Sequence, residues 1–243
     1  MGGTSSPAPG LKGICKNCEM PMVAKCGQHN IWHWAHKSRV NCDPWWETET
    51  EWHRSWKNWF PKEWHEFIQS DPDTGEKHIA DVKTDRGLVI EFQHSVMAPE
   101  ELMSREQFYQ NMVWIVDGCR GELDARHFNL GLGGPISDNP VAYSLHWYGR
   151  SKLFDNWIQA TKPVFVDFGQ IGLWRLVLYN RTSKRGVLGP INREHLVEDI
   201  TQGKPLEEWP MTDVLQDSVA DIPKADAPHL HNRENDDAQL ALF

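Results

Sequence analysis

The sequence predicts a mixed α/β fold, and three features of the chain support this prediction. An amphipathic segment precedes Pro61, a β-hairpin pattern occupies residues 78–93, and a helical segment that opens at Pro99 leads into the apolar run VWIVDG. Helical periodicity, short strand-like runs and turn residues between them are the signals that separate helices from strands. With a strand expected over residues 63–70, the predicted order is helix, three strands, helix, strand.

Composition indicates a packed chain whose two ends differ in charge. The 243 residues are 40% hydrophobic, include 13 Trp and carry a formal net charge of −9. Residues 1–46 hold five basic side chains against two acidic ones, whereas from Asp213 onward seven acidic residues face two basic ones. No apolar run approaches the length of a membrane span, so we expect a soluble cytoplasmic protein. Most of the net charge belongs to the tail.

A zinc-binding module is expected at residues 12–45. Its Cys-x-x-Cys pair has the spacing with which two thiolates bind one tetrahedral zinc ion, and such a short segment buries too little apolar surface to fold without a metal. The candidate zinc ligands are its cysteine and histidine side chains, namely Cys15, Cys18, His33, His36 and Cys42. We prefer His36 with Cys42 as the second pair, and His33 is the alternative.

The first helix is expected to begin after Pro44 and to end before Pro61. At 100° per residue, one side of it carries an apolar stripe. The stripe consists of Trp52, Trp56, Trp59 and Phe60. In this helical phase Glu49 lies on the same side as the stripe, whereas Glu47 and Glu51 point away from it.

The hairpin carries one carboxylate on each strand. A three-residue loop that ends in Gly87 fixes the register of the two strands, so that Val82 pairs with Ile90. One step further along, Asp81 lies opposite Glu91, with side chains about 5 Å apart.

Two like charges so close favour a cation between them, because otherwise one carboxyl group is driven to take up a proton. Gln93 lies two residues beyond Glu91 and therefore on the same face of the strand. Asp81 and Glu91 thus predict a site for a divalent metal ion with a polar group beside it.

Beyond Gly118 the pattern gives fewer assignments. Residues 131–140 are expected to form a loop, residues 162–189 two strands and a basic turn, and residues 194–200 a short helix. The basic residues of the turn, which are candidates for phosphate contacts, are Arg181, Lys184 and Arg185.

Taken together, the motifs resemble the competence protein CoiA family. They are the CKNC pair, HWAH, the ETEWH segment that starts at Glu49, IAD, EFQHS, and SREQFY followed by VWIVDG, and they span about residues 12–120. The resemblance implies that residues 46–200 contain a PD-(D/E)XK restriction-endonuclease-like core (αβββαβ) with a C-terminal extension. It also implies a DNA endonuclease that depends on Mg²⁺ or Mn²⁺.

The same resemblance assigns roles to individual residues. Those implied to bind the catalytic metal ion or to act in catalysis are Glu49, Asp81, Glu91 and Gln93. Gln93 stands where the superfamily usually has a lysine, so Lys83, on the same strand face as Asp81, is a candidate for the missing positive charge. The residues expected to border the site are Arg105, Tyr109, His53 and His78.

A disordered acidic tail is expected over residues 221–243. It ends in QLALF, which resembles the motif that binds the DNA polymerase III β sliding clamp. The contact residues would be Gln239, Leu240, Leu242 and Phe243. A flexible tether of this kind raises the local concentration of the attached domain on DNA.

Two other functions compete with the DNA nuclease. A catalytically inactive, zinc-containing DNA-binding adaptor is favoured by Gln93 and by the acidic charge balance. An RNA-processing nuclease would use the same metal chemistry on a different substrate. Cleavage assays with matched DNA and RNA distinguish these alternatives.

Overall fold

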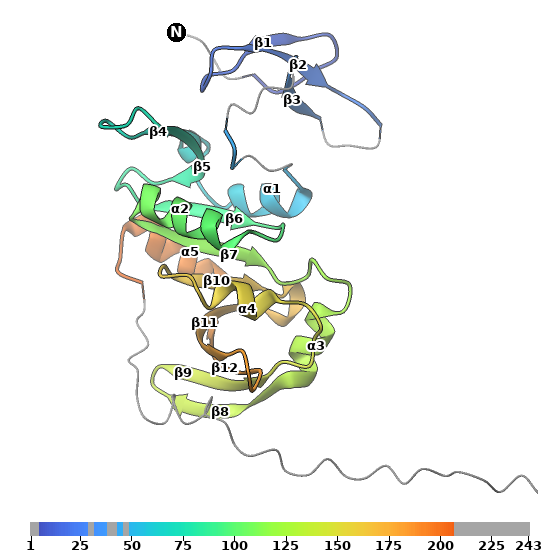
Figure 1. The fold of residues 1–243 in the computed structure, drawn as a ribbon, viewed down its shortest axis with the longest axis vertical. Helices are drawn as coiled ribbons and strands as arrows, with labels where there is room; N and C mark the ends of the chain where they lie inside the picture. The colour runs from blue at the N-terminus through green and yellow to red at the C-terminus, as the bar shows by residue number, and fades with distance from the viewer. Residues whose placement is uncertain (1–4, 29–31, 38–42, 46–48, 207–243) are drawn as a thin grey trace, which may run out of the picture.

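The computed structural model describes residues 5–28, 32–37, 43–45 and 49–206, and it shows two separate sheets. The small antiparallel sheet lies at one end of the molecule (Figure 1) and consists of β1 (Lys12–Ile14), β2 (Pro21–Lys25) and β3 (His33–His36). The tail residues Gln239, Leu240, Leu242 and Phe243 and the candidate zinc ligand Cys42 lie outside the described residues.

The large sheet has nine strands in the order β4-β5-β6-β7-β10-β11-β12-β9-β8. Its strands are β4 (His65–Ser70), β5 (Lys77–Lys83), β6 (Val89–Gln93), β7 (Met112–Asp117), β8 (Leu132–Asp138), β9 (Val141–His146), β10 (Val164–Asp167), β11 (Leu173–Asn180) and β12 (Arg185–Ile191). The pairings of β7 with β6 and with β10 are parallel, and the other pairings are antiparallel. The predicted mixed α/β class is therefore confirmed.

Helices cover both faces of the large sheet. They are α1 (Glu51–Lys57), α2 (Pro99–Tyr109), α3 (Asp124–Gly131), α4 (Leu153–Trp157) and α5 (Arg193–Gln202), with short 3₁₀ turns at Lys62–Trp64 and Gly169–Ile171. Buried residues of α2, α3 and α4 pack in one core, and those of α1 and α5 pack in another with side chains of β5, β6 and β7. Helices α1 and α2 thus approach the hairpin from opposite faces (Figure 1).

The hairpin has the predicted register. Val82 pairs with Ile90 and Lys83 with Val89, and Gly87 adopts a φ of 82°, a left-handed conformation that glycine takes without steric cost. Because loop length and strand alternation are local properties, the sequence alone was sufficient to place these pairs.

The first helix is shorter than predicted. It begins at Glu51 because the Thr50 side chain and His53 form a capping box, and it ends at Lys57. Trp59 lies in the turn that follows, where the helical phase no longer applies. It is 41% exposed, so its assignment to the buried stripe was wrong.

The C-terminal half contains strands that the sequence analysis missed. Residues 131–140, predicted as a loop, include β8, and the segment predicted as two strands forms three, β10 to β12. Strand β8 lies at the edge of the sheet and is irregular at Pro135. An edge position tolerates a residue without an N–H, so glycine and proline there do not prevent strand formation.

None of the helices in the described part of the chain has the length and apolar character needed to cross a bilayer.

Burial predicts different roles for two tryptophans near α1. Trp56 is 1% exposed and its indole N–H donates to Asp167 at 2.8 Å, whereas Trp59 is largely at the surface. We expect Trp56→Ala to lower the free energy of unfolding by about 3–5 kcal/mol, and Trp59→Ala by less than about 1 kcal/mol. Urea unfolding followed by circular dichroism measures both, and equal losses would contradict the assigned packing.

Candidate functional site

The hairpin opens at its two acidic residues. Regular pairing of β5 with β6 ends at Val82 and Ile90. Next to this pair the N–H of Phe92 donates to Asp81 Oδ2 at 2.9 Å, and the N–H of Asp81 donates to Glu91 Oε1 at 3.2 Å. Carboxylates thus satisfy two backbone donors of the hairpin, and the predicted meeting of Asp81 with Glu91 is confirmed by these bonds.

Lys57 of α1 extends into this opening. Its side chain is only 7% exposed, and Nζ lies 3.0 Å from Asp81 Oδ1 and 3.3 Å from Glu49 Oε1. It also contacts Glu66 of β4, whose φ of 51° places it in the left-handed region. One ammonium group therefore joins acids from three different segments.

Glu91 receives its cation from the other face. Arg105 of α2 donates from Nη1 to Glu91 Oε2 at 3.0 Å, and both side chains are 5% exposed. Arg105 also binds Glu101 one turn earlier on α2. The acid pair of the hairpin thus lies between a lysine on one face and an arginine on the other.

The two acids of the hairpin have shifted pKa values in opposite directions. Burial raises the pKa of Glu91, and the neighbouring charge of Asp81 raises it further against the effect of Arg105. Burial alone would also raise the pKa of Asp81, but Lys57 and the N–H of Phe92 outweigh burial and hold this pKa low. Glu91 is therefore the acid of the pair that takes up a proton more readily.

Lys57 is held in its charged form. Burial alone would lower its pKa, but Asp81, Glu66 and Glu49 together outweigh burial and raise it. A general base that gains and loses a proton near neutral pH is therefore not a role for Lys57. It acts as a fixed positive charge.

The cluster fits a divalent cation in donor type and in charge. Among the described residues, five acids and three bases form it, namely Glu49, Glu66, Asp81, Glu91 and Glu101 with Arg54, Lys57 and Arg105. Two negative charges remain uncompensated, and carboxylate oxygens are the ligands that Mg²⁺ prefers. Asp81 and Glu91 are adjacent, whereas Lys57 lies between Asp81 and Glu49.

Two predicted site residues have other contacts. Gln93 is 1% exposed and its amide nitrogen donates to the hydroxyl and the carbonyl of Ser95, at 3.1 and 3.3 Å. Lys83 donates to Gln69 at 2.9 Å and lies 4.6 Å above the ring of Phe67 on β4. The positive charge beside Asp81 comes from Lys57 instead of from Lys83.

The two histidines expected to border the site differ in their surroundings. His53 is buried and accepts the N–H of Thr50 through Nδ1 at 3.2 Å, so it caps α1 next to Asp81. His78 lies between the carboxylates of Asp43 and Glu76, at 2.9 and 2.7 Å. It thus anchors the segment that precedes α1.

Sequence reasoning also missed a histidine–aspartate pair beside the site. His94 Nδ1 lies 2.7 Å from Asp117 Oδ2, and the ring of His94 lies 6.0 Å from that of His53. Asp117 is buried at the end of β7, whereas the His94 side chain is 35% exposed. A buried carboxylate that orients an accessible imidazole is suited to proton transfer.

A metal-binding group is present in the small sheet. Cys15 follows β1, Cys18 lies in the next turn and His36 ends β3, and their ligand atoms all lie within 4.8 Å of one another. Cys18 Sγ is 3.2 Å from His36 Nε2. His33 begins β3 opposite Lys25 and is not part of this group. A Cys₂His set matches zinc, with room for a fourth ligand.

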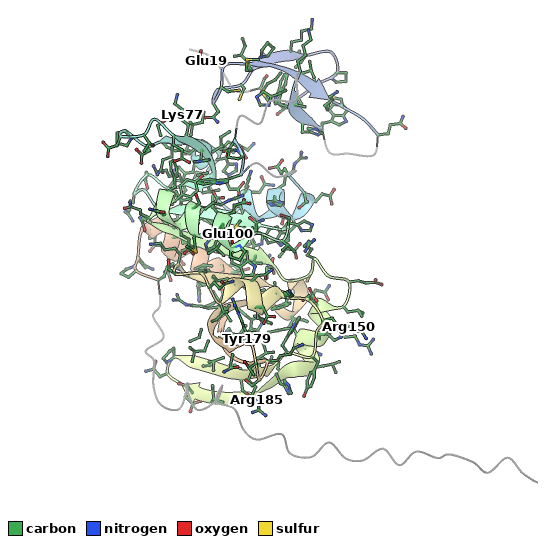
Figure 2. All side chains as sticks on the ribbon, in the orientation of Figure 1. Glu19, Lys77, Glu100, Arg150, Tyr179 and Arg185 are labelled. Carbon is green, nitrogen blue, oxygen red and sulfur yellow. The ribbon has the colours of Figure 1, made fainter. Side chains whose placement is uncertain are left out.

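The basic residues proposed for phosphate contacts lie far from the hairpin. Arg185 begins β12 and pairs with His146 of β9, at the end of the molecule opposite the small sheet that carries Glu19 (Figure 2). Arg181 donates to the carbonyl of Asp155 at 2.6 Å.

Comparison with known proteins places the N-terminal segment. Residues 12–44 match the family described as "Competence protein CoiA, N-terminal domain". No curated protein and no solved structure matches the chain. The match covers the small sheet and its metal-binding group, and it ends before α1.

The position of the two β3 histidines predicts which of them binds zinc. We expect His36→Ala to lose the bound zinc, because an imidazole is removed from the tetrahedral set, whereas His33→Ala keeps it. Metal analysis of the purified full-length chains measures the zinc content. Retention of zinc by His36→Ala together with its loss from His33→Ala would reverse the assignment.

Proposed function

We propose that this protein is a metal-dependent nuclease that hydrolyses phosphodiester bonds of DNA. The observation that carries the proposal is the opening of the hairpin, where Asp81 and Glu91 leave two negative charges uncompensated. The order α1, β4, β5, β6, α2, β7 agrees with the PD-(D/E)XK core that the motifs suggest. The CoiA-type N-terminal segment supports a role in competence and hence DNA as the substrate.

In this proposal Asp81 and Glu91 would hold Mg²⁺ or Mn²⁺, with Glu49 beside them. The bound cation would lower the pKa of the attacking water and stabilise charge on the phosphate. Arg105 orients Glu91 through their hydrogen bond. The pair of His94 and Asp117 is placed to carry a proton at the edge of the site.

Lys57 supplies the positive charge that Gln93 cannot. It is fixed on α1, it is charged, and it contacts Asp81 directly. A preorganised charge in a site sheltered from water stabilises a developing negative charge more than the same charge in solution does. The proposed contact of Gln239–Phe243 with the β sliding clamp rests on the sequence alone.

Substitution of the hairpin acids tests the metal-dependent reaction. We expect Asp81→Asn and Glu91→Gln each to lower the rate of Mg²⁺-dependent DNA cleavage more than about 100-fold, because each removes a cation ligand. Glu100→Gln is the matched control, since Glu100 is an exposed acid in the first turn of α2 (Figure 2).

Cleavage is measured on duplex, single-stranded and branched DNA and on RNA of the same sequences. A wild-type protein that cleaves none of them in Mg²⁺ or Mn²⁺ would be an adaptor of the zinc-containing DNA-binding class. Preference for RNA would indicate the RNA-processing alternative.

A second pair of variants separates the two lysines. We expect Lys57→Gln to lower the cleavage rate about 100-fold or more, because the charge beside Asp81 is lost, and Lys83→Gln to remain near the wild-type rate. Circular dichroism confirms that both variants fold. A larger defect in Lys83→Gln than in Lys57→Gln would disprove the role given to Lys57.

A further inference from the structure

Two arginines join the acids of the site to the N-terminal part of the chain. Arg54 of α1 donates from Nε to Glu49 Oε2 at 2.9 Å and from Nη2 to the carbonyl of Trp32 at 3.2 Å. Trp32 directly precedes β3, the strand that ends in the candidate zinc ligand His36. One guanidinium group thus connects the small sheet to an acid of the proposed cation site.

Arg105 makes the second connection, from the opposite face. Nη1 donates to Glu91 Oε2 at 3.0 Å and Nη2 to the carbonyl of Trp45 at 2.7 Å. The guanidinium also lies 5.5 Å from the centre of the Trp45 ring. Trp45 belongs to the segment between the small sheet and α1, so this arginine too holds an acid and an N-terminal carbonyl together.

The segment around Trp45 is itself fixed on the large sheet. The Trp45 ring stacks on His78 with centroids 3.2 Å apart and planes inclined by 12°. Asp43 accepts the N–H groups of Trp45 and Ile79, at 3.0 and 2.8 Å, and pairs with His78. Because His78 and Ile79 belong to β5, the segment is anchored on the strand that carries Asp81.

We propose that the N-terminal module controls the cation affinity of the Asp81–Glu91 site through the positioning residues Arg54 and Arg105, so that zinc loading of the module sets this affinity. The inference rests on the proposed function, because it concerns the cation that this function needs. A guanidinium is a rigid fork that bonds two acceptors at once. Displacement of Trp32 or Trp45 therefore moves the acid bound to the other branch of the fork.

The two connections are unequal. Arg105 and Glu91 are each 5% exposed, whereas Arg54 and Glu49 are 40% and 34% exposed. A solvent-exposed ion pair contributes little, and a buried one depends strongly on both partners. The connection through Arg105 should therefore dominate.

The test compares full-length variants by two measurements that do not depend on cleavage. One is hydrogen exchange over residues 79–93, where the Asp81 and Phe92 amides are bonded to carboxylates. The other is the Mg²⁺ affinity, read from the Mg²⁺ concentration that protects this segment from exchange. Cys15→Ser combined with Cys18→Ser removes zinc without a chelator that would also remove Mg²⁺.

We expect the zinc-free double variant and Arg105→Lys to exchange faster in this segment and to bind Mg²⁺ about 10–100-fold more weakly, as loss of a partner that orients a metal ligand does. Arg54→Lys should show a smaller change. Arg181→Lys is the matched control and should behave as wild type, since Arg181 also donates to a backbone carbonyl but at Asp155.

Wild-type exchange and Mg²⁺ affinity in the zinc-free double variant would overturn this proposal and leave the nuclease standing. If that variant does not fold, wild-type behaviour of Arg105→Lys overturns it equally. Absence of Mg²⁺ binding by the wild-type protein would instead overturn the proposed function, and the control of affinity with it.

Discussion

The burial of Lys57 among carboxylates is the interaction on which the rest of the site depends. An ammonium group that is 7% exposed is costly unless acids surround it. Its partners come from the segment before α1, from β4 and from β5, so the same contact fixes α1 against two strands. Removal of any partner leaves a charge without compensation. The position of α1 and the electrostatics of the hairpin are therefore one problem with one solution.

Local rules explain why part of the site was predictable. Loop length and strand alternation place Asp81 beside Glu91 without reference to the rest of the chain. The same rules failed for Glu49, which was assigned to the buried side of a helix that in fact begins after Thr50. Glu49 reaches the site through Lys57, and such a contact depends on how a helix packs on a sheet.

The C-terminal half was less predictable because its structure depends on distant pairing. Strand β8 has glycine and proline where an inner strand would have apolar residues, and only its place at the edge beside β9 explains it. Buried strands such as β7 announce themselves by a continuous apolar run. Strand β12 pairs with both β11 and β9, and this pairing brings together residues distant in sequence.

A lysine on the helix instead of on the strand changes how the site handles charge. A lysine at position 93 would lie on the Glu91 face, whereas Lys57 contacts Asp81 from the other face and also holds Glu49 and Glu66. Two of these acids are thereby occupied before any metal ion arrives, and Glu91 is left with a raised pKa and one arginine. Affinity for a cation then depends mainly on how Glu91 is held. This is why the contact between Arg105 and the N-terminal segment matters more than its distance in sequence suggests.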